Sequence, residues 1–197
     1  QVKDLYQAKK FLEKAIEIKN DYSETHYNLG NVLKDLGEIQ KAINCFEKVI
    51  QINPDNADAH NNLGNLLKKI GKIQEAENCY KKTIKINPNY SSAYNNLATI
   101  FQKYKNFQEA INLYEKTIQL NPNFALPYNN LGLIFHELEE YQKAINSFEK
   151  AIKIKPDYAE AHSHLGMIFK ELGNFEQAIN CFKTTLKYKP DDLITLH

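Results

Sequence analysis

Apolar residues recur every three or four positions in short segments of the chain, and breaks rich in Gly, Asn and Pro separate these segments. Residues 57–70 form one such segment, and residues 73–86 form the next. The first segment carries one helical stripe, made of Leu63, Leu66, Leu67 and Ile70. Gly71 separates the two segments, and Asn87-Pro88 follows the second, where the proline pushes the residue before it out of the α region. The pattern predicts a helix, a tight turn, a second helix and a stop.

The same two-helix pattern returns every 34 residues. Five prolines keep this register: Pro54, Pro88, Pro122, Pro156 and Pro190. The glycines fall into two columns, Gly30, Gly64, Gly132, Gly166 and Gly37, Gly71, Gly173. We therefore expect five complete units, at 23–56, 57–90, 91–124, 125–158 and 159–192. Residues 1–22 fit only the second helix of a truncated preceding unit, and residues 193–197 fit the start of a truncated following one. A chain cut within a repeat at both ends is expected to be a fragment of a longer protein.

Small residues recur where the paired helices are expected to touch. An alanine column runs through the second segments: Ala8, Ala42, Ala76, Ala110, Ala144 and Ala178. A column of large residues accompanies it: Leu12, Phe46, Tyr80, Tyr114, Phe148 and Phe182. Two antiparallel helices approach to about 8 to 10 Å only where some contact positions lack bulk. We therefore predict that Gly64 and Ala76 make room for Tyr80 between the helices.

Two stretches of the chain carry a family resemblance. "YNLGNVL" (27–33) and "KAINCFEKVIQINP" (41–54) resemble the first and second helices of the tetratricopeptide repeat (TPR), although His or Tyr stands where that family often has Trp. The resemblance covers almost the whole chain. It implies an all-α fold, the TPR alpha-alpha superhelix, which is a right-handed solenoid of antiparallel helix pairs. It also implies a concave groove, lined by the first helices, that binds a protein or peptide.

Asparagines dominate the positions expected to line that groove. The candidate peptide-binding residues are Tyr27, Asn28, Asn31, Asn61, Asn62, Asn65, Asn95, Asn96, Asn129, Asn130 and His164. An Asn side chain offers a donor and an acceptor, as a peptide group does, so a ladder of amides can hold an extended backbone whatever its side chains are. The TPR grooves of O-linked N-acetylglucosamine transferases are similar in having such a ladder. The alternative is that these asparagines serve solubility and local hydrogen bonding.

Three roles remain open at this point. The first is a scaffold or adaptor that binds an extended polypeptide. The second is a substrate-recruiting arm of a larger enzyme, such as a glycosyltransferase similar to O-linked N-acetylglucosamine transferase. The third is self-assembly through the truncated ends or through the groove. A clamp for a terminal carboxylate is disfavoured, because Asn61, Asn95 and Asn129 occupy the column where such a clamp has its first lysine.

Composition narrows the picture further. With 25 Lys+Arg against 24 Asp+Glu, interspersed along the chain, we expect neither nucleic acid nor a membrane surface as partner. Cys45, Cys79 and Cys181 form no CxxC pair, so they are read as reduced thiols in an intracellular, cytoplasmic protein. His26, His60 and His162 fall in a packing column, which favours a structural role. We expect no catalytic residue, no metal site and no cofactor in this segment.

Overall fold

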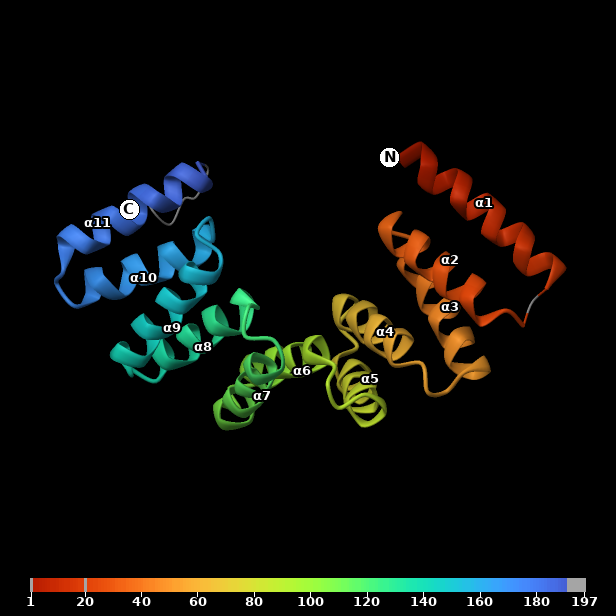
Figure 1. Ribbon diagram of the computed structural model, residues 1–197, viewed down its shortest axis with the longest axis horizontal. Helices are drawn as coiled ribbons and strands as arrows, with labels where there is room; N and C mark the ends of the chain where they lie inside the picture. Colours follow the sequence, from red (N-terminus) through yellow and green to blue (C-terminus); the bar gives the residue numbers. More distant parts are fainter. Residues whose placement is uncertain (1, 20, 191–197) are drawn as a thin grey trace. The chain divides into compact units, whose positions relative to one another are not determined.

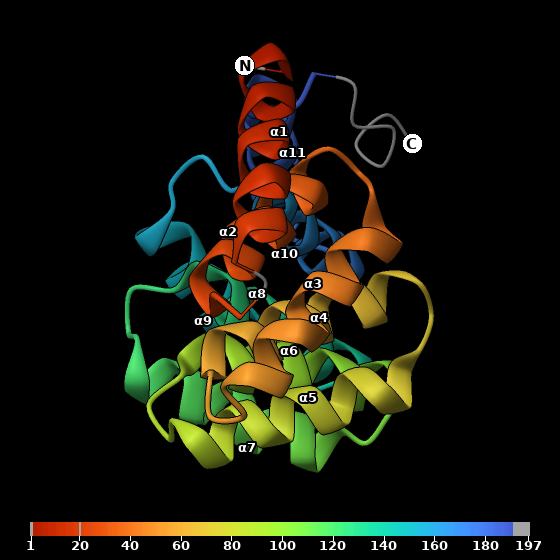
Figure 2. The same ribbon diagram turned by 90° about the vertical axis from the view of Figure 1, so that its right-hand side faces the viewer.

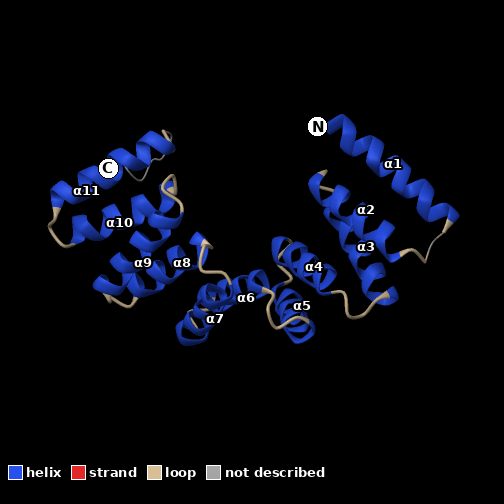
Figure 3. Cartoon of the chain, in the orientation of Figure 1, coloured by secondary structure: helices blue, strands red, loops and turns tan. Residues whose placement is uncertain are grey.

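The computed structural model describes residues 2–19 and 21–190, and the backbone there is helical apart from short connections (Figure 3). The helices are α1 (Val2–Ile18), α2 (Ser23–Asp35), α3 (Ile39–Ile52), α4 (Ala57–Lys69), α5 (Ile73–Ile86), α6 (Ser91–Lys103), α7 (Phe107–Leu120), α8 (Ala125–Glu137), α9 (Tyr141–Ile154), α10 (Ala159–Glu171) and α11 (Phe175–Tyr188). Those two ranges contain no strand, which confirms the all-α class. The first helix expected over 193–197 lies outside the described residues.

Contacts divide the chain into two compact units, unit 1 (Gln1–Ile100) and unit 2 (Phe101–His197), and each is described by itself. In unit 1, α2 packs against α3 and α4 packs against α5 (Figure 1). The second helix of one pair also contacts the first helix of the next, as α1 does with α2 and α3 with α4. Unit 2 repeats this arrangement with the pairs α8–α9 and α10–α11, and with α9 against α10; Figure 2 shows the same helices turned by 90°.

A missing side chain on the first helix makes room for an aromatic ring on the second. A Cβ atom built on Gly64 would lie 2.7 Å from Cε1 of Tyr80, and one built on Gly132 would lie 2.6 Å from Cε1 of Phe148. Both rings are fully buried, as is Ala76 beside Tyr80 in α5. These distances confirm the prediction that glycine lets the paired helices approach around a large ring.

The turn inside each pair passes through the left-handed region of backbone conformation. Gly37, Gly71 and Gly173 have φ values of 77°, 83° and 77° there. Lys105 and Glu139 occupy the same point in the two remaining pairs, with φ values of 57° and 60°. Glycine adopts this conformation without steric cost, whereas a residue with a Cβ atom is strained by about 1 to 2 kcal/mol. The turn is therefore set by the length of the repeat, and glycine eases it without being required.

The connections between pairs are held by side chains at their ends. The amide oxygens of Asn53 and Asn87 accept hydrogen bonds from the backbone N–H groups two residues later, at 3.3 and 3.0 Å. His60 Nε2 donates to the carbonyl oxygen of Pro54 at 3.0 Å, and His162 Nε2 donates to that of Pro156 at 2.9 Å. A carbonyl can only accept, so each ring carries its proton on Nε2. Both histidines thus fasten the preceding loop, in agreement with the structural role expected for them.

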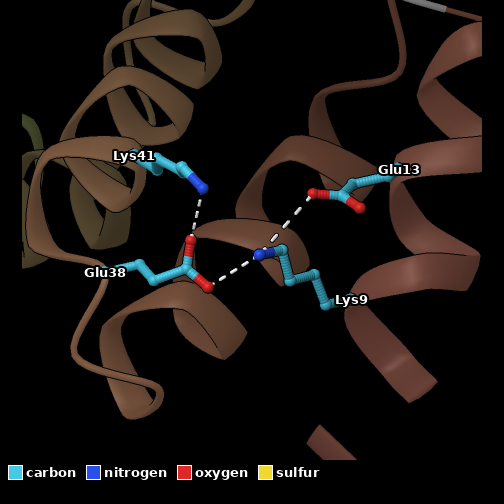
Figure 4. Close-up of polar contacts among 4 residues, drawn as sticks. All are labelled: Lys9, Glu13, Glu38 and Lys41. Carbon is cyan, nitrogen blue, oxygen red and sulfur yellow. Dashed lines mark hydrogen bonds and ion pairs between the residues drawn. The ribbon is translucent and has the colours of Figure 1, made fainter. Parts of the chain in front are cut away.

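Helix α1 is fastened to the first complete pair by a small charge network (Figure 4). Lys9 Nζ lies 2.6 Å from Glu38 Oε1 and 4.0 Å from Glu13 Oε1, and Lys41 Nζ lies 2.6 Å from Glu38 Oε2. Hydrogen bonds from Lys41 and Lys9 lower the pKa of the Glu38 carboxyl, and the bond to Glu38 raises the pKa of Lys9. The network therefore weakens both as pH falls through the lowered pKa of Glu38 and as pH rises through the raised pKa of Lys9.

Candidate peptide-binding face

The expected groove residues of unit 1 share one side of the first helices α2, α4 and α6. We call this surface the asparagine face, and it consists of Tyr27, Asn28, Asn31, Asn61, Asn62, Asn65, Asn95 and Asn96. Spacings of three and four residues place side chains on one side of a helix, and the period of 34 residues repeats that side in the next first helix. The structure brings several of these residues into direct contact across neighbouring helices.

Hydrogen bonds join the asparagines of one first helix to those of the next. Asn62 Nδ2 donates to the hydroxyl of Tyr27 at 3.1 Å, which links α4 to α2. Asn96 Nδ2 lies 3.2 Å from Asn61 Oδ1 and 2.9 Å from Asn65 Oδ1, which links α6 to α4. The face is therefore a braced network of amides rather than a row of independent side chains. Sequence reasoning found the residues but missed these bonds.

Helix α5, the second helix of its pair, also forms a hydrogen bond with this network. The hydroxyl of Tyr80 in α5 donates to Asn65 Oδ1 at 2.8 Å, so this oxygen accepts from two donors at once. Burial raises the pKa of the Tyr80 hydroxyl, which keeps its proton and remains a donor. The orientation of the Asn65 amide is thus fixed from two sides.

The predicted residues that share the repeat position of Asn61 lie beneath the surface, apart from Tyr27, which is partly exposed. Asn61, Asn95 and Asn129 expose only 6%, 4% and 5% of their area, and Ser163 in the same column exposes 2%. Asn61 Oδ1 is bonded to Asn96, whereas the Oδ1 atoms of Asn95 and Asn129 are buried without a hydrogen-bond partner in the described part of the chain. This column is therefore placed to support its neighbours, and it presents little area to a ligand.

The other predicted residues of unit 1 lie at the surface. Asn28 is exposed and makes no hydrogen bond among the described residues, while Asn31, Asn62, Asn65 and Asn96 are partly exposed. Each of these amides carries two donor hydrogens and two acceptor positions, so the bonds just described leave hydrogen-bonding capacity on the exposed side. These residues are the ones in unit 1 that a ligand backbone can reach.

The corresponding surface of unit 2 is less polar. Asn130 Nδ2 donates to the hydroxyl of Tyr114 at 3.1 Å, and that hydroxyl donates to Gln102 Oε1 at 2.7 Å. The ring of His164 lies against that of Phe148, with centroids 5.5 Å apart. Leu133 and Met167, both partly exposed, stand where unit 1 has asparagine or threonine. Unit 2 therefore combines one amide rung with apolar and aromatic surface.

Lysines border the asparagine face at the ends of the first helices. Lys34 Nζ donates to Asn31 Oδ1 at 3.2 Å and lies 3.8 Å from Asp35 Oδ1. Lys68 Nζ, one repeat later, donates to Thr99 Oγ1 at 3.2 Å. Desolvation lowers the pKa of Lys68, because burial disfavours its charged form. Positive charge therefore borders the amides. At Lys68 this charge is partly buried and so partly shielded from water.

Two of the cysteine thiols are held in their protonated form. Burial raises the pKa of the Cys45 and Cys79 thiols to about 11, so both stay protonated near neutral pH and are poor nucleophiles. Within residues 2–19 and 21–190, no three His, Cys, Asp or Glu side chains gather as metal ligands would. None of the helices described there is both long and apolar enough to cross a bilayer. The described side chains are arranged for contact by hydrogen bonds.

Structural comparison finds close likenesses among solved repeat proteins. The chain is 28% identical to MamA, with a TM-score of 0.72 over 82% of this chain and 95% of that one. It is 21% identical to pilF of Pseudomonas aeruginosa, with a TM-score of 0.86 over 98% of this chain and 88% of that one. YrrB, described as a TPR protein with an unusual peptide-binding site, is 20% identical, with a TM-score of 0.72 over 94% and 96% of the two chains. No curated protein sequence matches the chain.

Sequence profiles of one repeat family match most of the chain. The profile described as tetratricopeptide repeat matches residues 57–90, 91–124 and 159–192, and related profiles of the same repeat match residues 1–22, 30–71, 113–146 and 132–173. With the helix pairs described above, these matches confirm the expected fold class, an all-α TPR superhelix. The chain belongs to the tetratricopeptide repeat family.

Proposed function

We propose that this chain is a protein-protein interaction module, a scaffold or adaptor that holds an extended polypeptide against its first helices. TPR proteins typically act as non-catalytic interaction scaffolds, and the chemistry of the described face agrees with such a role. The candidate contacts in unit 1 are the surface amides of Asn28, Asn31, Asn62, Asn65 and Asn96. In unit 2 they are Asn130 and His164, with Leu133 and Met167 beside them.

The braced amide network is the observation that carries the proposal. An exposed amide whose position is already fixed by Tyr27, Tyr80 or a neighbouring asparagine can meet a peptide N–H or C=O without first losing its own freedom. First helices about 10 Å apart would meet about every third residue of an extended chain, which advances about 3.3 Å per residue. The peptide-binding site reported for YrrB, a protein of similar fold, is in keeping with this use of the fold.

The test compares asparagines on the two sides of the helix pairs. A phage-displayed library of random 12-residue peptides is selected on the wild-type protein, and the recovered peptides are measured by fluorescence anisotropy. The variant Asn28→Ala/Asn62→Ala/Asn96→Ala is expected to bind at least tenfold more weakly, because each lost amide removes one or two hydrogen bonds of about 1 kcal/mol each.

The matched control is Asn44→Ala/Asn78→Ala/Asn112→Ala, which removes three exposed asparagines of the second helices and is expected to leave affinity unchanged. Circular dichroism establishes that both triple variants are folded. A library that yields no binding peptide, or equal affinity of the two triple variants, contradicts the proposed function.

Self-association is a second candidate function, and the exposed apolar surface of α1 favours it. Phe11 and Ile18 in α1 expose 71% and 88% of their area. Exposed apolar groups of this size tend to be covered by another surface. Sedimentation velocity over a hundredfold range of concentration tests the idea. A dimer that disappears in Phe11→Lys/Ile18→Lys supports it, and a monomer at all concentrations excludes it.

A further inference from the structure

Lys68 combines a half-buried side chain with a neutral hydrogen-bond partner at the edge of the asparagine face. Its side chain is half-buried at the end of α4, and its ammonium group contacts Thr99 Oγ1, a neutral acceptor. No carboxylate forms an ion pair with Lys68 Nζ in the part of the chain that the structure describes. Burial is accordingly the single cause of its lowered pKa, with no opposing attraction from an acidic group. The charge is partly removed from water without a counter-ion.

The equivalent lysine one repeat earlier shows what Lys68 lacks. Lys34 lies 3.8 Å from the carboxylate of Asp35, the next residue in the chain. At the corresponding place after Lys68 the chain has Lys69, a second positive charge. The helix therefore supplies a compensating carboxylate at Lys34 and none at Lys68.

Lys68 also has donor hydrogens to spare at the edge of the asparagine face. An ammonium group has three, and one is used on Thr99, whose own hydroxyl donates to the backbone carbonyl of Asn96 at 2.7 Å. Asn96 in turn bonds to Asn65, so Lys68, Thr99 and the braced amides form one connected patch. A ligand that contacts these amides passes beside the ammonium group.

We propose that the polypeptide bound by unit 1 places an acidic side chain, aspartate or glutamate, on Lys68. This inference rests on the proposed function and adds the chemistry of the partner to it. A carboxylate would accept the remaining donor hydrogens and neutralise a charge that the fold leaves without a partner. The carboxylate belongs to a side chain rather than to a chain end, because surface amides continue from this point along α4 and α2 and would hold backbone on past it.

The experiment uses the peptides selected on the wild-type protein, synthesised with an amidated C-terminus so that side chains supply the only carboxylates. Each peptide is paired with an analogue in which Asp is replaced by Asn or Glu by Gln. For the wild type we expect the amide analogue to bind about tenfold more weakly, which is the low end for a charge-assisted hydrogen bond. The difference should shrink between about 50 mM and about 500 mM salt, because added ions screen charge pairs.

Two variants locate the effect. Lys68→Met keeps the length of the side chain and is expected to bind each peptide and its amide analogue equally. Lys69→Met removes an exposed lysine from the next position and is expected to keep the tenfold preference. Matching circular dichroism spectra and unfolding temperatures show that the variants are folded. The comparison of each peptide with its amide analogue on the wild-type protein does not depend on any variant.

The outcomes separate this inference from the proposed function. Peptides that bind the wild type as tightly as their amide analogues overturn the acidic contact and leave peptide binding intact. The acidic contact is also overturned if Lys68→Met keeps the preference, or if binding requires a free C-terminal carboxylate. A library without any binding peptide overturns the proposed function and this inference with it.

Discussion

The first helices of the two units carry the same repeat columns but hold them together differently. In unit 1, Asn61 Oδ1 accepts a hydrogen bond from Asn96, one rung later. The equivalent of Asn61 in unit 2 is Asn129, whose Oδ1 is buried without a partner among the described residues. The next rung there is His164 instead of asparagine. His164 offers no amide donor to Asn129, but Asn95 in unit 1 also keeps its Oδ1 buried without a partner among the described residues, so the bond seen at Asn61 is not repeated at every rung.

The aromatic column divides in the same way. Tyr80 in unit 1 donates its hydroxyl to Asn65, whereas Phe148 in unit 2 has no hydroxyl and Leu133 stands in the place of Asn65. In these two repeats the tyrosine hydroxyl and its amide acceptor are present together or absent together, although Tyr114 in unit 2 also bonds to Gln102 and Asn130. The exchange is local to a repeat and not a property of a whole unit, because Phe46 in unit 1 lacks the hydroxyl although Asn31 stands in the column of Asn65.

The largest expected effect concerns the glycine column. Gly132→Ala should lower the free energy of unfolding by about 2 to 3 kcal/mol, since the new Cβ atom would lie 2.6 Å from the buried ring of Phe148. Gly30→Ala in unit 1 should cost under about 1 kcal/mol, because the ring of Phe46 is 3.0 Å away and alanine is the better helix former. Urea denaturation measures both, and equal losses would contradict the packing argument.

The second prediction transfers a polar group between units. Phe148→Tyr should cost about 1 to 2 kcal/mol, because its hydroxyl would lie beside Leu133, where unit 1 has the acceptor Asn65. Adding Leu133→Asn supplies the partner found in unit 1 and should recover about half of that loss. The reverse change, Tyr80→Phe, should cost about 1 kcal/mol. A double-mutant cycle checks the coupling, and strict additivity would refute it.

A third change restores the missing rung. His164→Asn should raise the free energy of unfolding by about 0.5 to 1 kcal/mol, since an asparagine there can donate to the buried oxygen of Asn129 as Asn96 does to Asn61. Asn96→His should produce a loss of similar size in unit 1. Thermal unfolding of the two variants provides the measurement, and a loss of stability in His164→Asn would count against the comparison.

The smallest effect concerns the turns. Unit 1 uses Gly37 and Gly71 at the left-handed position, whereas unit 2 has Glu139 there, with a φ of 60°, as well as Gly173. Glu139→Gly should stabilise by about 0.5 kcal/mol, because relief of the strained backbone exceeds the added freedom of the unfolded chain. Gly71→Glu should destabilise by about 1 kcal/mol, the cost of a Cβ atom in the left-handed region. Urea midpoints resolve such differences, and a destabilised Glu139→Gly would show that the turn is not strained.

The fold was predictable from the sequence because its signals are local. The stretch predicted as a helix over 57–70 is observed as Ala57–Lys69, and that predicted over 73–86 is observed as Ile73–Ile86. Proline and glycine act on the backbone within a few residues, so their columns mark the ends of helices without any knowledge of packing. The left-handed Lys105 and Glu139 were not anticipated, although gaps in the glycine column at these positions were the available signal.

The candidate site was predictable only in part. The columns of asparagines identified the face, but its hydrogen bonds join residues 31 and 35 positions apart, such as Asn65 with Asn96 and Asn61 with Asn96. Such bonds depend on how one helix pair is rotated against the next, which no local pattern specifies. The same rotation buries Asn61 and leaves Asn62 partly exposed.

The bracing of the asparagines has a consequence for how fast and how selectively a partner is held. A flexible amide chooses its orientation when a ligand arrives, whereas Asn62, Asn65 and Asn96 are oriented when the protein folds. Their donors and acceptors thus form a fixed template, which favours rapid docking of any chain able to lie straight along it. Under the proposed function, chains stiffened into helices or tight turns would be rejected, so discrimination at this surface would depend first on the conformation of the partner and only then on its sequence.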